Sequence, residues 1–427
     1  MEIGLSARAN PNLFGIELLK IKKANTFYLW PMSKQSKCSV EDTLRLRPRN
    51  QTAPKNDSSL IMGAEQTDVY GPLLKGKKIA LVVNQTSLIG HTHLVDSMLS
   101  LGIKVQVIFA PEHGFRGDHS AGAHVNSVVD QKTGIKISSL YGKNKKPTSA
   151  DLSGIDYVVF DIQDVGVRFY TYISTMHYVM EACAENNVPL IIFDRPNPNG
   201  HYVDGPVLDT KFKSFIGMHP VPLVHGLTVG EFAQMIQGEN WLADGKKCQL
   251  TIIKIKGYTH GSLYKLPIRP SPNLSTQESI YLYPSLGLFE GTNVSVGRGT
   301  PTPFEWLGRP GLKNGSTVYI PIKIPGVADD PPYEGKSCRG ILLTEFCNHY
   351  LLDSKQVYLE WLLLFYKSNT IENGDFFKTS SFDRLAGSDQ LRLQIVAGKT
   401  SLEIRDSWKA DLIKYEGMRR KYLLYEL

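Results

Sequence analysis

The stretch 111–117, with the sequence PEHGFRG, places a carboxylate, an imidazole and a guanidinium close together along the chain. It follows an apolar run, 105–110, that is typical of a buried strand. Loops after buried strands are where α/β proteins place binding and catalytic residues. Glu112, His113 and Arg116 are therefore candidate active-site residues, although a polar turn with a charged rim has the same pattern.

Glu112 is a candidate general acid. Glycoside hydrolysis commonly needs two carboxyl groups, one protonated and one ionised, on either side of the bond that breaks. Positive charge on His113 and Arg116 would stabilise the Glu112 anion, whereas burial would raise its pKa, and the sequence leaves the balance open. Three residues are candidates for the second carboxylate: Glu290, which lies in a glycine-rich loop, Asp161 and Asp164.

Polar and aromatic side chains near these loops would suit a sugar ligand. Arg168 and Arg298 could bind a substrate carboxylate, because the guanidinium fork matches a carboxylate, or they could be structural ion-pair partners. The predicted substrate-binding residues are Asn84, Arg116, Arg168, Tyr170, Tyr172, Asn273, Tyr283 and Arg298.

Apolar runs alternate with amphipathic segments in the first two thirds of the chain. The predicted strands are 79–83, 105–110, 157–160, 189–193 and 248–255. This alternation predicts an α/β fold, with a Rossmann-like, mostly parallel sheet that has helices on both faces. Polar residues follow four of the strands: Asn84, Glu112, Asp161 with Asp164, and Asp194. The carboxyl ends of parallel strands share one edge, so we expect these residues to converge there.

Three regions are predicted along the chain. Residues 1–65 show no sustained period and are expected to be a poorly ordered extension or leader. Residues 66–275 form the Rossmann-like catalytic domain, and 276–427 a smaller C-terminal α+β domain that contributes to the cleft. In the latter, 318–324 and 340–346 are predicted strands and 357–366 a buried helix. A capping box at 275–278 opens a helix that Pro284 should end.

Composition argues against several classes of protein. The net charge is +7, but the basic residues are dispersed and form no basic-aromatic stripe, so we expect no nucleic-acid partner. No apolar run approaches the ~20 residues of a membrane span. The first strand is not followed by the glycine pattern of a dinucleotide site, and the spacing of His113, His119 and His124 matches no compact zinc signature. We therefore predict neither a cofactor nor a metal.

Several longer motifs, in order along the chain, resemble the exo-β-N-acetylmuramidase (NamZ-like) family, long described only as a domain of unknown function. The resemblance covers roughly residues 65–427. It is carried by residues 83–87, 111–117, 161–172, 194–198, 271–274, 290–292, 297–300 and 421–425.

The resemblance implies an exo-acting glycosidase that releases N-acetylmuramic acid from the non-reducing ends of peptidoglycan fragments, in the periplasm or cell envelope. Muramyl oligosaccharides would be the ligands, with Glu112 as acid and Glu290 as second carboxylate. The lactyl carboxylate of the sugar would give Arg168 or Arg298 a partner. The substrate acetamido group could replace the second carboxylate, oriented by Asp161 or Asp164.

Two other functions remain open from the sequence. One is a non-catalytic protein that binds cell-wall carbohydrate in the same cleft. The other is a metal-dependent amidase or esterase acting on muropeptides. The sequence leaves the oligomeric state undetermined.

Overall fold

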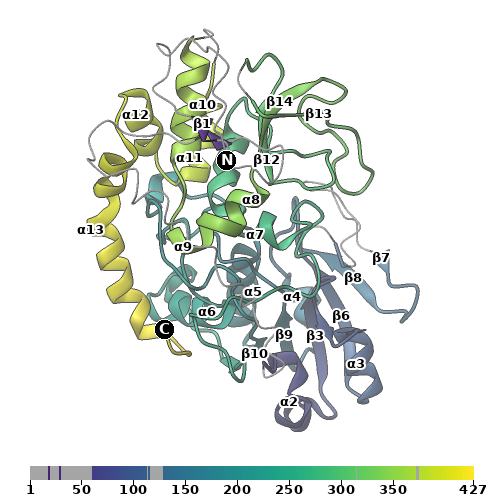
Figure 1. Ribbon diagram of the computed structural model, residues 1–427. Coiled ribbons are helices and arrows are strands. Elements are labelled where there is room, and N and C mark those ends of the chain that lie inside the picture. Colours follow the sequence, from purple (N-terminus) through teal and green to yellow (C-terminus); the bar gives the residue numbers. More distant parts are fainter. Residues whose placement is uncertain are drawn as a thin grey trace, which may run out of the picture.

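The structure is a computed structural model that describes residues 60–112, 114–115, 128–313, 315–371 and 375–427, with the backbone of two short strands, β1 (Leu18–Leu19) and β2 (Tyr28–Leu29). His113 and Arg116 lie outside the described residues. Figure 1 shows the large sheet in the lower part of the molecule and the C-terminal elements above it.

The large sheet has the strand order β11-β10-β9-β3-β6-β8-β7. All neighbouring strands are parallel except the antiparallel pair of β7 and β8. Numbered along the chain, the six parallel strands follow the Rossmann order 3-2-1-4-5-6, which confirms the predicted fold class. The strands are β3 (Lys78–Val83), β6 (Lys104–Ala110), β7 (Val128–Val129), β8 (Lys136–Ser139), β9 (Tyr157–Asp161), β10 (Leu190–Phe193) and β11 (Leu250–Ile253).

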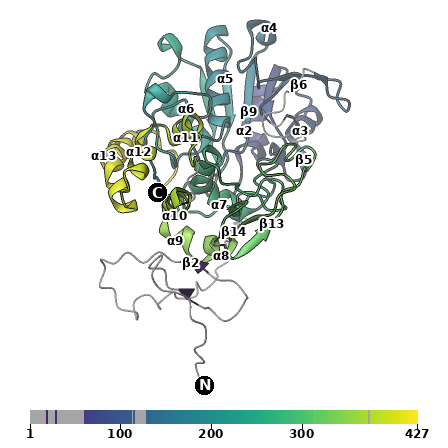
Figure 2. The same ribbon diagram turned by 90° about the horizontal axis from the view of Figure 1, so that it is seen from above.

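Helices cover both faces of this sheet because successive side chains of a strand point to opposite sides. In β3, Ala80 and Val82 pack into one apolar cluster, while Ile79 and Leu81 pack into the other. The first cluster includes α5 (Tyr172–Asn186) and α6 (Val229–Gly238), and the second α2 (Thr67–Leu74) and α3 (Leu94–Ser100). Figure 2 shows α5 and α6 on the opposite side of the strands from α3.

The C-terminal part contains a small antiparallel sheet, β12-β14-β13, and a group of helices. Its main elements are α7 (Gln277–Leu286), η4 (Gly287–Gly291), β12 (Trp306–Arg309), β13 (Thr317–Tyr319), β14 (Cys338–Leu342), α10 (Glu360–Ile371), α11 (Thr379–Ala386), α12 (Gln390–Val396) and α13 (Ser401–Arg419). Shorter elements are α4 (Ser149–Leu152), α8 (Thr344–Phe346), α9 (Leu352–Ser354), η5 (Cys347–Leu351), η6 (Arg420–Tyr422) and the hairpin strands β4 (Leu88–Ile89) and β5 (Thr92–His93).

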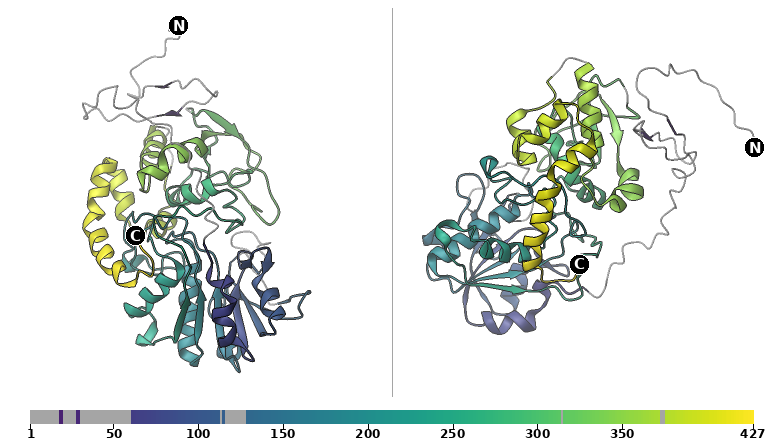
Figure 3. Two further views of the ribbon diagram at one scale, coloured as in Figure 1. Left: turned by 60° about the horizontal axis from the view of Figure 1, so that its bottom comes forward. Right: turned by 90° about the vertical axis from the view of Figure 1, so that its left-hand side faces the viewer.

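The two parts share one apolar cluster and are also joined by the C-terminal helix. Figure 3 shows α13 running from the C-terminal helices down to the side of the large sheet. Along it, the Tyr415 hydroxyl donates a hydrogen bond to the carbonyl of His225, 2.7 Å away. Beyond it, the Tyr425 hydroxyl donates to Asp194, which follows β10. The C-terminal segment therefore packs back onto the first part of the molecule.

Some predicted details were wrong. The N-cap of α7 is Thr276 rather than Ser275, and the helix continues through Pro284 to Leu286. A proline inside a helix leaves the carbonyl four residues earlier without its donor. Here the Nδ2 of Asn199 donates to that carbonyl, on Ile280, at 3.2 Å. A partner from another part of the fold thus satisfies the free carbonyl.

Segment boundaries also differ from the predictions. The strands predicted at 318–324 and 340–346 are Thr317–Tyr319 and Cys338–Leu342, and β8 was not predicted. Residues 60–65, assigned to the extension, pack against the sheet: Gly63 donates a backbone hydrogen bond to the carbonyl of Asp194. Apart from the backbone of β1 and β2, residues 1–59 lie outside the described part. The predicted domain boundary between residues 275 and 276 stays a prediction.

Candidate active site

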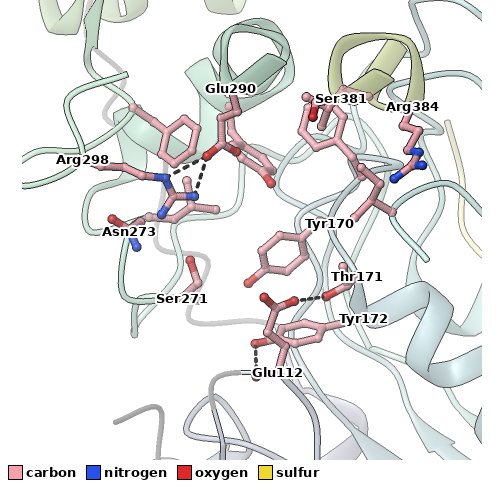
Figure 4. A pocket seen from close by; sticks show the side chains of 16 residues that line it. Glu112, Tyr170, Thr171, Tyr172, Ser271, Asn273, Glu290, Arg298, Ser381 and Arg384 are labelled. Atoms are coloured by element: carbon pink, nitrogen blue, oxygen red, sulfur yellow. Dashed lines mark hydrogen bonds and ion pairs between the residues drawn. The ribbon is translucent and has the colours of Figure 1, made fainter. Parts of the chain in front are cut away.

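A cavity of about 360 Å³ lies where the two parts of the molecule meet. The segment Phe169–Tyr172, which leads into the first residue of α5, forms one wall together with Glu112. Residues from the C-terminal part close the other side, as Figure 4 shows. Of the residues predicted from the sequence, Glu112, Tyr170, Tyr172, Asn273, Tyr283, Glu290 and Arg298 line this cavity.

Glu112 follows β6 and is held by two hydroxyl groups. The Thr171 hydroxyl donates a hydrogen bond to its Oε2 at 2.8 Å (Figure 4). The Tyr141 hydroxyl is also hydrogen-bonded to Glu112, and burial together with this carboxylate raises the pKa of Tyr141 to about 12. Because both donors come from outside the loop of Glu112, the orientation of this carboxylate depends on tertiary packing.

An aromatic wall lies beside Glu112. Tyr170 and Tyr172 pack edge to face with ring centroids 4.8 Å apart, and Tyr283 packs in the same way against Phe169 at 5.0 Å. The Tyr170 hydroxyl donates to the carbonyl of Pro270 at 2.9 Å. Such contacts fix the rings, so the wall offers a rigid, partly apolar surface of the kind that packs against a sugar ring.

Glu290 lies on the opposite side of the cavity from Glu112 (Figure 4). The Nε and Nη2 atoms of Arg298 both lie 2.8 Å from Oε1 of Glu290. Burial alone would lower the pKa of Arg298, but the Glu290 carboxylate raises it. The guanidinium also lies 5.2 Å from the ring centre of Phe304. Glu290 and Arg298 thus form an ion pair, and Oε2 of Glu290 has no partner among the described residues.

Glu290 is placed by close packing between η4 and α11. A Cβ atom on Gly291 would lie only 2.5 Å from the Cα of Phe382, so glycine is required for this approach. The Lys378 amide donates to the carbonyl of Gly291 at 2.8 Å. The loop that carries Glu290 therefore depends on a helix about ninety residues later in the sequence.

Arg168 does not line the cavity, in contrast to the prediction. Its side chain is 1% exposed. Its guanidinium donates to four backbone carbonyls, those of Pro206, Val221, Leu385 and Ala386. Burial lowers its pKa to about 9. Arg168 therefore connects the Rossmann-like part to the end of α11 and is not placed to bind a substrate carboxylate.

The predictions for Asp161, Asp164 and Asn84 also need correction, since all three are buried outside the cavity lining. Asp161 accepts two hydrogen bonds from Arg195, at 2.6 and 2.8 Å. Asp164 accepts from the amide of Gly166, and burial raises its pKa to about 7. The Oδ1 of Asn84 accepts two hydrogen bonds from Thr86, so it shapes the turn after β3.

Residues missed in the sequence also line the cavity. They are Phe169, Thr171, Ile216, Ser271, Leu274, Phe304, Ser381, Arg384 and Leu385. Thr171 lies between two predicted tyrosines, and its hydroxyl could have been recognised there. Residues on α11 gave no such signal, because they reach the cavity only through the packing of α11 on η4.

Neither a metal cluster nor a membrane helix is found in the described part of the chain. No three His, Cys, Asp or Glu side chains there are grouped so as to hold a metal ion. The histidines weighed as metal ligands, His113, His119 and His124, lie outside it. No helix among the same residues is long and apolar enough to cross a membrane.

A carboxylate on each side of a cavity beside aromatic side chains is the arrangement that glycoside hydrolases use. Comparison with known proteins agrees with this class. Residues 79–278 match the N-terminal domain of the exo-beta-N-acetylmuramidase NamZ family, and residues 281–425 match its C-terminal domain. The chain belongs to this family.

Individual relatives cover most of the chain. It is 39% identical over 398 residues to the peptidoglycan beta-N-acetylmuramidase NamZ of Bacillus subtilis (strain 168), covering 88% of this chain and 94% of the relative. Crystal structures of two DUF1343 family proteins from Bacteroides fragilis NCTC 9343 are similar to it. Their TM-scores are 0.80 and 0.70 at 45% and 28% identity, each covering 86% of this chain and 99% of the other.

Proposed function

We propose that this protein is an exo-acting glycoside hydrolase that releases N-acetylmuramic acid from the non-reducing ends of peptidoglycan fragments. The observation that carries the proposal is a single cavity with Glu112 on one side and Glu290 on the other, in a member of the exo-β-N-acetylmuramidase family. Its ligands are muramyl oligosaccharides.

Glu112 is the general acid that protonates the leaving oxygen, and the hydroxyls of Thr171 and Tyr141 keep it in position. Glu290 is the second carboxylate, and its Oε2, to which no described residue donates a hydrogen bond, is available to a water molecule or to the sugar. The acetamido group of the substrate is the alternative to Glu290 as nucleophile. In that case Glu290 orients the acetamide, because Asp161 and Asp164 are buried outside the cavity.

The test is mass spectrometry of products from a defined disaccharide of N-acetylmuramic acid and N-acetylglucosamine. We expect the two free monosaccharides, because hydrolysis adds one water molecule across the glycosidic bond. NMR of the N-acetylmuramic acid as it is first released then shows retention or inversion at the anomeric carbon. Retention indicates a nucleophile, and inversion indicates a carboxylate that activates water. An intact disaccharide that binds without turnover would instead indicate a carbohydrate-binding protein.

A metal-dependent amidase or esterase predicts different products. It would remove the peptide from a muropeptide and leave the disaccharide intact, and a chelator would abolish the reaction. We expect glycosidase activity to persist in EDTA. As peptidoglycan lies outside the cytoplasm, we also propose that the protein works in the periplasm or cell envelope. Cell fractionation followed by immunodetection tests this location.

A further inference from the structure

The sequence offered Arg168 and Arg298 as partners for a substrate carboxylate, and neither has a free guanidinium in the structure. Arg168 is buried against four backbone carbonyls. Arg298 is paired with Glu290 through two nitrogen atoms. A substrate carboxylate near Arg298 would also meet the negative charge of Glu290, which offsets the attraction. A carboxylate ligand therefore needs another cation at the cavity.

Arg384 meets this need. It lies on α11 and lines the cavity, where Figure 4 shows it on the side opposite Arg298. Its side chain is exposed, and its guanidinium has no hydrogen bond or ion pair with any residue that the structure describes. An arginine in this position presents a charged, planar donor set to whatever enters the cavity.

The backbone around Arg384 is fixed to both parts of the molecule. Arg168 donates to the carbonyls of Leu385 and Ala386, at 3.1 and 2.7 Å, and to Pro206 and Val221 of the Rossmann-like part. On the other side of Arg384, Asp383 accepts two hydrogen bonds from Arg392, both 2.8 Å long. These hydrogen bonds fix the backbone position of Arg384 with respect to the cavity wall that contains Glu112.

We propose that Arg384 binds the lactyl carboxylate of the N-acetylmuramic acid residue at the non-reducing end and so selects muramyl over glucosaminyl substrates. The inference rests on the proposed function. N-acetylmuramic acid differs from N-acetylglucosamine only in its lactyl ether, which carries the carboxylate. The guanidinium forms two parallel hydrogen bonds to a carboxylate, an arrangement that a neutral hydroxyl cannot match. Arg384 is thus a specificity-determining residue, and Arg168 is a positioning residue behind it.

Kinetics with two chromogenic substrates test the inference. One is 4-nitrophenyl β-N-acetylmuramide, and the other is the same compound with its lactyl carboxylate converted to a methyl amide. For Arg384→Met we expect KM for the acid to rise about 10- to 100-fold, with kcat little changed. The amide substrate should be cleaved equally well by both proteins. Arg384→Lys should recover part of the loss, because an ammonium keeps the charge without the fork.

A matched control separates recognition from net charge. Arg420 is exposed in η6, away from the cavity lining, and Arg420→Met should leave KM for both substrates unchanged. An unchanged KM for the acid in Arg384→Met, or an equal rise for acid and amide, would overturn the inference.

Equilibrium binding keeps the inference testable apart from catalysis. We expect calorimetry to show that Arg384→Met binds N-acetylmuramic acid about 10- to 100-fold more weakly than the unmodified protein. Binding of N-acetylglucosamine should not change. If the protein binds N-acetylmuramic acid in this way but cleaves no muramide, the proposed function fails while the role of Arg384 stands. Equal affinity of both proteins for N-acetylmuramic acid contradicts the role of Arg384.

Discussion

Two groups of carboxylates in the molecule differ in what surrounds them. Glu112 and Glu290 line a cavity, and each keeps contact with open space. Asp161 and Asp194 are fully buried. Asp161 is bound by Arg195, and Asp194 accepts hydrogen bonds from Thr228, Gly230 and Tyr425.

The comparison shows that a carboxylate can serve two purposes in this molecule. Where the protein supplies all its partners, the carboxylate connects loops and holds the sheet edge together. Where the carboxylate faces a cavity, as in Glu112 and Glu290, it can act on a ligand. The same chemical group thus has roles that depend on its neighbours.

Glu112→Gln gives the largest expected effect on activity. Loss of a positioned general acid should lower kcat for the disaccharide of N-acetylmuramic acid and N-acetylglucosamine, whose sugar leaving group must be protonated, about 10²- to 10⁴-fold. The free energy of unfolding should change little, because the amide can still accept from Thr171. Steady-state kinetics and urea denaturation measure the two effects. Activity within a few fold of the unmodified protein would remove Glu112 as the acid.

Asp161→Asn should have the opposite effect: a large loss of stability and an unchanged kcat. It leaves the buried Arg195 guanidinium without its counter-charge, so we expect the free energy of unfolding to fall by about 3–5 kcal/mol. The folded fraction should keep its kcat. Denaturation of Asp161→Asn, Arg195→Gln and the double variant gives the coupling energy of the pair. A stable Asp161→Asn protein that has lost its activity would place Asp161 with the catalytic residues instead.

Thr171→Val tests how the cavity carboxylate is held. It removes the hydrogen bond to Oε2 of Glu112, and hydrogen bonds to charged groups are worth about 1.5–3 kcal/mol. We expect kcat/KM to fall roughly 10- to 100-fold. Thr175→Val serves as control: Thr175 lies in α5, of which Thr171 is the N-cap, and among the described residues its hydroxyl bonds only to the carbonyl of Thr171. Equal losses in both variants would mean that the effect is a general disturbance of α5.

Asp164→Asn tests how the buried carboxyl group of Asp164 makes stability depend on pH. Burial raises the Asp164 pKa from 3.8 to about 7, so between these values the folded protein binds more protons than the unfolded chain. This group therefore lowers stability as the pH rises from about 4 to about 7, by at most ~1.4 kcal/mol per pH unit. Urea denaturation across this range should show a smaller decline for Asp164→Asn. Exposed Asp68→Asn is the control, and identical pH profiles for all three proteins would contradict the raised pKa.

Much of the fold follows from local patterns. The runs at 79–83, 105–110 and 157–160 are apolar because both faces of these strands are buried, and that pattern is visible in the sequence. Pro284 shows where such reasoning failed, since Asn199, from another part of the chain, donates to the carbonyl that this proline leaves without its helical donor. Strand β8 was missed because it is short and only partly apolar.

For the site, residue types and their spacing predicted the candidate carboxylates and the tyrosines around 170, and the longer motifs indicated the family of the chain. Glu112 and Glu290 were among these candidates, but their positions on opposite sides of one cavity depend on residues that are 178 apart in the chain. The packing of α11 on η4 and the hydrogen bonds of Arg168 come from long-range contacts, which no local pattern encodes. The role of Arg168 as an internal connection and the position of Arg384 at the cavity follow from the folded structure, because burial and partners determine what a charged side chain can do.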